Sequence, residues 1–219
     1  MANINLSDVS LYVLCAILGN WWGESNINPG IWEGLQVVSW DTWYHGYGFG
    51  QWTNTSASNM RLQNLYNYMT AHNYDPWDPY GQIEFLLYEN VWYQEAEASA
   101  YSSLTDFLLS TDTDITALTH AWCIGWEGIH DSSWDTRVQH AYDIYSYIMQ
   151  HANDPSITAW TIENNFLSVT DLCNNGVLLY RYFDSGAILP VPTPPYPPVP
   201  PEPGKGKKHM PVWMMIRYF

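Results

Sequence analysis

The sequence predicts a predominantly helical α+β protein, and three observations carry that prediction. Apolar residues recur at helical spacing in several segments, which are separated by turns rich in Pro, Gly, Asn and Asp. One stretch, 46–53, instead alternates glycine with aromatic residues, which is typical of a short β-hairpin whose backbone approaches another group closely. After Gly186 the composition changes to mostly proline, so the folded part is expected to end near that residue.

The first helix is expected to begin at Leu6-Ser7-Asp8, with Ser7 as its N-cap. Its apolar positions run on toward Glu24, and the turn Asn28-Pro29-Gly30 forbids a longer helix. The helix therefore carries Glu24 at its far end. The hairpin at 46–53 follows, and further helices are expected over 59–72, 82–93, from 103, from 114 to about 127, 133–151 and roughly 162–183.

Composition divides the chain into four parts. Residues 1–152 form the main domain, and 153–185 form a helical extension that belongs either to that domain or to a tether. A proline-rich linker spans 186–204 and predicts a semi-rigid polyproline II spacer. The last part, 205–219, is basic and then apolar, and we expect an anchor peptide for another protein, carried by Trp213, Met214, Met215, Ile216 and Phe219. A tail folded back on its own domain and a lipid interface are the alternatives.

The charge balance excludes some partners. The formal net charge is −15, and only Arg61 and Arg137 are basic before residue 181. Such a body is repelled by nucleic acid and by anionic membranes, so no nucleic-acid partner is expected and membrane contact is the less favoured interpretation. Cys15, Cys123 and Cys173 are expected to be free buried thiols. No cofactor or metal is expected, because the histidines lack metal-ligand spacing, and no standard export signal is recognised.

Glu24 lies next to two tryptophans, at the junction between the first helix and its closing turn. Desolvation against aromatic faces raises a carboxyl pKa, so this environment suits a general acid. A solvated helix-end glutamate is the alternative. The following loop contains Trp32, Trp40, Trp43 and Tyr44, for which two interpretations stay open. They form either a satellite core or a platform on which sugar rings stack.

Two motifs identify a resemblance. Gly-Asn-Trp-Trp-Gly-Glu-Ser-Asn-Ile-Asn-Pro-Gly at 19–30 and Gly-Tyr-Gly-Phe-Gly-Gln-Trp-Thr at 46–53 resemble the phage tail lysozyme family. The segments 82–87 and 125–128, followed by Arg137, also look like family landmarks, and the likeness covers roughly 7–150. It implies a lysozyme-like fold with a small hairpin facing the catalytic helix end, with 1–152 as the catalytic domain. The wider kinship resembles goose-type lysozymes and lytic transglycosylases.

The resemblance also implies roles for individual residues. Glu24 would protonate the glycosidic oxygen of peptidoglycan as general acid, and Gln51 would hydrogen-bond the sugar or a water. The alternative for Gln51 is a side chain that only satisfies the hairpin backbone. Groove and substrate contacts are expected from Ser25, Tyr47, Phe49, Trp52 and Arg137. Ser25 has the alternative of supporting the turn, and Arg137 that of balancing a nearby acid.

A second carboxylate is less clearly indicated. Glu33 and Asp41 are the candidates for a base across the groove, and Glu127 is a weaker one. If none is placed correctly, Glu24 acts alone in a transglycosylase that closes a 1,6-anhydro ring.

The leading interpretation is a virion lysozyme at the phage tail tip. It would cut the MurNAc-GlcNAc strand of the host wall when the genome enters, while the C-terminal peptide binds other tail proteins. The alternatives are a non-catalytic tail component that keeps the fold and an endolysin that acts at host lysis.

Overall fold

The computed structural model describes residues 4–93, 95, 100–129 and 134–186. The α-helices are α1 (Leu11–Ser25), α2 (Arg61–Ala71), α3 (Pro79–Glu89), α4 (Leu104–Leu108), α5 (Ile115–Trp122), α6 (Trp134–His151) and α7 (Val169–Ser185). Shorter turns are the 3-10 helices η1 (Leu6–Asp8) and η2 (Glu33–Leu35) and the π-helical turn η4 (Cys123–Glu127). The strands β1 (Gly46–Tyr47), β2 (Trp52–Ser56) and β3 (Asn59–Met60) form an antiparallel sheet in that order. The predicted fold class, mostly helical α+β with a small hairpin, is confirmed.

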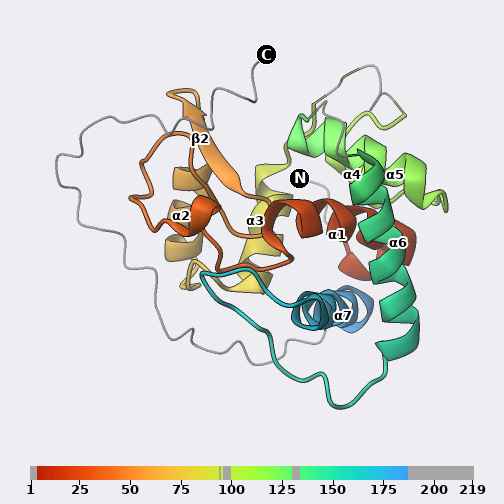
Figure 1. The fold of residues 1–219 in the computed structure, drawn as a ribbon. Coiled ribbons are helices and arrows are strands. Elements are labelled where there is room, and N and C mark those ends of the chain that lie inside the picture. Colours follow the sequence, from red (N-terminus) through yellow and green to blue (C-terminus); the bar gives the residue numbers. More distant parts are fainter. Residues whose placement is uncertain (1–3, 94, 96–99, 130–133, 187–219) are drawn as a thin grey trace.

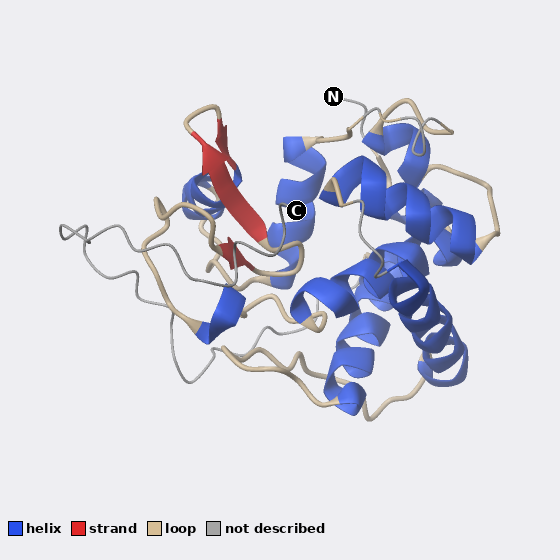
Figure 2. Cartoon of the chain, turned by 45° about the horizontal axis from the view of Figure 1, so that its top comes forward, coloured by secondary structure: helices blue, strands red, loops and turns tan. Residues whose placement is uncertain are grey.

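Helix α1 passes through the middle of the molecule. Helices α5 and α6 pack on one side of it, and β2 and α2 lie on the other (Figure 1). Helix α7 packs against both α1 and α6. Figure 2 shows the strands gathered at one side of the molecule, apart from the group of helices at the other. Glu24 is therefore at the end of a helix that has α5 and α6 on one side and β2 and α2 on the other.

The start of α1 differs from the prediction. Leu6–Asp8 form only the 3-10 turn η1, and α1 begins at Leu11 with Ser10, not Ser7, as its N-cap. The Ser10 Oγ accepts a hydrogen bond from the backbone N–H of Val13 at 3.3 Å, which satisfies one free donor of the first turn. Extended backbone at Val9 and Ser10 interrupts the helical path between the two segments.

The packing of α1 on α6 requires Gly19. A Cβ atom at this position would lie 2.6 Å from the Cβ of Ala141 and 2.7 Å from the carbonyl oxygen of Arg137. Both separations are shorter than van der Waals contact, so no larger residue fits without moving the helices apart. The glycine therefore brings the backbone of α6, with Arg137, directly against the last turns of α1.

Residues 153–185 pack as part of the main body. Asn175 of α7 donates from Nδ2 to the carbonyls of Ile27 at 3.0 Å and Thr161 at 2.8 Å. Asn28 donates to the carbonyls of Glu163 at 2.7 Å and Asn165 at 2.9 Å. These bonds tie the turn after Glu24 to the segment before α7. They also hold residues 163–165 outside a helix, so the helix predicted from 162 begins only at Val169.

Other boundaries moved by a few residues. The helix expected from 59 begins at Arg61, because Asn59–Met60 pair with β2 as β3. The helix expected over 82–93 spans Pro79–Glu89, with Asp78 as its cap. Cys15, Cys123 and Cys173 are buried thiols, as predicted. Within the described residues, no helix is both long and apolar enough to cross a membrane. The linker beyond Gly186 and the proposed anchor peptide, 205–219, lie outside the described residues.

Candidate active site

Glu24 and Arg137 form a partly buried ion pair at the end of α1. The Nη2 of Arg137 donates to the Oε1 of Glu24, and the two side chains are 7% and 10% exposed for Arg137 and Glu24, respectively. An ion pair of this kind involves the ionised carboxylate. The expectation that Arg137 balances a nearby acid is therefore met by Glu24 itself.

Arg137 is held in place by the helix that carries Glu24. Its Nη1 donates to the backbone carbonyl of Asn20 at 3.2 Å and to the Asn20 Oδ1 at 3.3 Å. Asn20 is fully buried, and its Nδ2 donates to the carbonyls of Ala16 at 2.9 Å and Thr119 at 3.1 Å. Asn20 therefore links α1, α5 and α6, and it orients the guanidinium toward Glu24.

A second carboxylate, Glu127, lies beside this pair. It ends the π-helical turn η4, and its Oε1 accepts a hydrogen bond from the indole N–H of Trp122 at 3.3 Å. Burial and the negative charge of Glu24 raise the pKa of Glu127 to about 8, against the opposing charges of Arg137 and Arg61. Glu127, the weakest of the three candidates for a second carboxylate in the sequence analysis, is thus the one that interacts with Glu24.

Arg61 extends the charged cluster toward the sheet. Its Nε and Nη2 donate to the two oxygens of Glu89 at 2.6 and 2.8 Å, a bidentate pair that also receives the indole N–H of Trp52 at 3.2 Å. Trp126 directly precedes Glu127 in the chain. The Arg61 guanidinium carbon lies 4.6 Å from the centre of the Trp126 ring, a cation–π contact. The positive charges of Arg61 and Arg137 both act to lower the pKa of Glu127.

The glycine-rich hairpin reaches this cluster through close backbone contact. A Cβ atom on Gly50 would lie 2.2 Å from the Trp126 ring, so only glycine allows this approach. The Phe49 ring stacks on Trp21 of α1, with centres 5.0 Å apart and planes at 3°. The sheet is thus fixed against both the Glu24 helix and the Glu127 turn.

The structure corrects the roles expected for three aromatic residues. Tyr47, Phe49 and Trp52 were expected to shape the substrate groove, but all three are fully buried. Tyr47 ends β1, Phe49 lies in the turn and Trp52 begins β2, and all three side chains are covered by other parts of the protein. The alternation of glycine and aromatics therefore marks tight packing and not an open surface. For the aromatic residues of the loop after α1, each of the two interpretations, core or sugar-stacking platform, fits two residues. Trp32 and Trp40 are buried core residues, while Trp43 and Tyr44 are 46% and 39% exposed.

The remaining predicted residues have structural partners. The buried Ser25 donates from Oγ to the carbonyl of Trp21 at 3.0 Å, which is the turn-supporting alternative. Gln51 donates from Nε2 to the carbonyls of Gly48 at 3.0 Å and Ile31 at 3.4 Å, which fits its alternative of satisfying the hairpin backbone.

Neither loop carboxylate joins the Glu24 cluster. Glu33 accepts a hydrogen bond from the backbone N–H of Gly46 at 2.9 Å and so anchors β1. Asp41 is exposed and accepts a hydrogen bond from Ser39.

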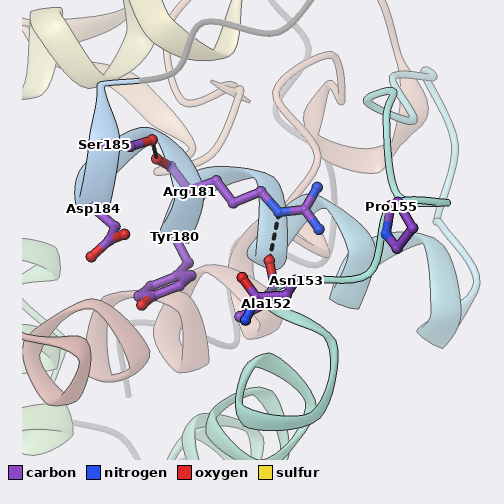
Figure 3. A pocket seen from close by; sticks show the side chains of 7 residues that line it. All are labelled: Ala152, Asn153, Pro155, Tyr180, Arg181, Asp184 and Ser185. Atoms are coloured by element: carbon purple, nitrogen blue, oxygen red, sulfur yellow. Dashed lines mark hydrogen bonds between the residues drawn. The ribbon is translucent and has the colours of Figure 1, made fainter.

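A hollow elsewhere on the surface is not part of this cluster. It lies where the chain leaves α6 and passes α7, and Figure 3 shows its lining residues, with Arg181 extending across it. The Arg181 guanidinium donates to the carbonyls of Ala152 at 2.7 Å, Ile157 at 2.6 Å and Asp154 at 2.6 Å. Arg181 therefore fastens the loop after α6 to α7.

Within the described residues, no group of three or more His, Cys, Asp or Glu side chains is arranged to hold a metal ion.

Sequence reasoning missed the supporting residues of the cluster. Asn20 stands four residues before Glu24, so both face the same side of α1, a spacing that the sequence displays. Arg61 and Glu89 meet only through the packing of α2 on α3, for which the sequence gives no local signal.

The mostly helical body and the small antiparallel sheet, packed beside a glutamate-bearing helix end, define a lysozyme-like fold. The comparison with protein families agrees. A family model described as phage tail lysozyme matches residues 5–148, and the chain belongs to that family. No curated protein matches the sequence. The chain thus contains a lysozyme-like domain of a phage tail, from a family of peptidoglycan-degrading glycosidases. Helix α7 lies outside the matched range, although it shares the core.

Proposed function

We propose that this protein cleaves the MurNAc-GlcNAc glycan strand of bacterial peptidoglycan, with Glu24 as the general acid. The observation that carries the proposal is the cluster of Glu24, Arg137 and Glu127 at the end of α1. A family of glycosidases needs a positioned carboxyl group that protonates the leaving oxygen of an oxocarbenium-like transition state. Glu24 is the only carboxyl group in the motif at 19–30 that resembles the phage tail lysozyme family. The buried Asn20 and Arg137 hold it in position through hydrogen bonds.

The bond is broken in one of two ways. In a hydrolase a water molecule adds to the sugar carbon and leaves a reducing end. In a lytic transglycosylase the sugar's own hydroxyl adds and leaves a 1,6-anhydro end. Both require the same proton on the leaving oxygen, so Glu24 is essential in either case.

Mass spectrometry of soluble fragments tests the proposal. Purified peptidoglycan is incubated with the wild type, with Glu24→Gln and with Glu163→Gln, the same exchange at an exposed side chain. We expect fragments from the wild type and Glu163→Gln only. Reducing muramic ends would identify a hydrolase, and 1,6-anhydro muramic ends would identify a lytic transglycosylase. Thermal unfolding of Glu24→Gln checks that it is folded. Absence of cleavage by the wild type on several wall types would favour the non-catalytic tail component.

We further propose that the domain works at the tail tip of the virion and opens the host wall when the genome enters. The composition of the C-terminal part supports this placement. A proline-rich spacer followed by a basic and apolar peptide suits attachment to another tail protein, with the enzyme held at a distance from it.

A further inference from the structure

We propose that Glu127 is the proton-holding partner of Glu24: the two carboxyl groups share one proton near neutral pH, and Glu127 carries it in the substrate-free protein. This inference rests on the proposed function, since it explains where the proton of the general acid is kept. It makes Glu127 a positioning residue that acts through Glu24.

The first argument is the distribution of hydrogen-bond donors. The Glu24 carboxylate receives a charged donor from Arg137, whereas Glu127 accepts one neutral donor, the Trp122 indole, among the described residues. Arg61, the other nearby cation, is bound to both oxygens of Glu89. The carboxyl group without a guanidinium bonded to it is the one on which a proton costs least.

The second argument is the charge on the buried groups. Two carboxylates that interact electrostatically in a partly desolvated site do not both ionise readily, because each disfavours the charge of the other. The Glu24 charge acts on Glu127 in this sense, and the resulting pKa of about 8 keeps Glu127 protonated at neutral pH. Arg137 and Arg61 oppose this effect, while Tyr93, in the segment before α4, interacts with Arg61.

The third argument is that the proton can change its carboxyl group without a change in total charge. The positive charge of Arg137 acts on Glu24 and on Glu127. A state with the proton on Glu24 and an ionised Glu127 therefore still has a guanidinium beside the charged group. Glu24 acts as an acid in that second arrangement, and the first one stores the proton.

The proton balance closes over a catalytic cycle. Glu24 gives the shared proton to the glycosidic oxygen, and the bond between that oxygen and the sugar carbon breaks with its electron pair on the leaving oxygen. An incoming hydroxyl, of water or of the sugar itself, forms the new bond to the carbon and releases its proton to the carboxylate pair. The pair starts and ends with one proton.

Glu127→Gln is the variant that tests the inference. Glutamine has the shape of the neutral acid and keeps an oxygen for the Trp122 indole, so folding should persist, but it cannot exchange a proton. We expect the activity of the wild type to fall above about pH 8. In Glu127→Gln that alkaline limb should move to lower pH by more than about one unit, with at least a roughly tenfold loss at pH 7, because the site has then lost the carboxyl group that stores the proton.

Three results would overturn the inference, and each differs from a failure of the proposed function. The first is a Glu127→Gln profile that superimposes on those of the wild type and of Glu163→Gln, which would leave Glu127 a structural role. The second is a folded Glu127→Gln without activity at any pH, which would make Glu127 the direct donor. The third comes from carbon-13 titration of the glutamate carboxyls. We expect the Glu127 pKa to fall in Glu24→Gln, and an unchanged value would remove the pairing. If the wild type itself does not cleave, the proposed function fails first.

Discussion

The ionisation of Glu127 should make the stability of the protein depend on pH in a defined window. Burial and the charge of Glu24 raise its pKa from 4.5 to about 8 in the folded protein, and the unfolded chain returns to the lower value. Between these two values the folded state binds one more proton than the unfolded state, so the free energy of unfolding falls as the pH rises. Below the window both states carry the proton, and above it neither does.

The magnitude follows from one proton. Its slope is at most about 1.4 kcal/mol per pH unit. Between pH 6.5 and pH 8 the wild type should therefore lose roughly 2 kcal/mol, which corresponds to a decrease in Tm of roughly 4–8 °C for a chain of this size. Burial lowers the pKa of His140 below 6.5, so its ionisation makes the free energy of unfolding rise with pH in that lower range. The change in the wild type is therefore evaluated from pH 6.5 upward.

Calorimetry of the wild type and Glu127→Gln between pH 5 and pH 9 measures this effect. The variant keeps every other titrating group, so the difference between the two Tm values reports the proton that the carboxyl pair loses with Glu127. The two proteins should melt at similar temperatures near pH 5, and the variant should melt higher at pH 8 and above. Glu163→Gln should keep the slope of the wild type. Parallel Tm curves for the wild type and Glu127→Gln would refute the reasoning.

Two further predictions concern the architecture around Glu24. Gly19→Ala places a methyl group 2.6 Å from Ala141, so we expect a loss of about 1–3 kcal/mol in chemical denaturation and reduced cleavage as α6 moves away. A chain that ends at residue 152 lacks α7 and should show no cooperative unfolding transition. A chain that ends at 186 should stay folded and active but fail to join phage particles. A cooperative transition in the shorter chain would contradict the first expectation, and normal incorporation of the longer one would contradict the second.

The parts of the fold that the sequence predicted are those that depend on local patterns. The helix starts near 103 and 114 and the glycine-rich hairpin could be predicted because a cap or a turn needs particular residue types at fixed positions. The start of α1 was missed because Ser7 and Ser10 offer equal caps. Only the extended backbone at Val9 distinguishes them, and no residue type requires that conformation.

The site was predictable to the extent that its chemistry lies in one segment. Glu24 could be selected from its place at a helix end, whereas its neighbour Glu127 depends on how far apart α1 and η4 lie after packing. The burial of Tyr47, Phe49 and Trp52 was missed for a related reason. An alternating pattern indicates that successive side chains of a hairpin point to opposite faces, but it does not show whether one face or both are covered.

The motif that carries the family resemblance contains more architecture than chemistry. Gly19 admits α6, Asn20 bonds to Arg137 and to α5, and Ser25 and Asn28 fasten the turn that follows the helix. Glu24 is the only member of that segment with a carboxyl group. Gly19 and Asn20 therefore determine where Arg137 lies, and through Arg137 which of the two carboxyl groups stays ionised. A substitution at Asn20 should thus alter the pH range of cleavage without touching either glutamate.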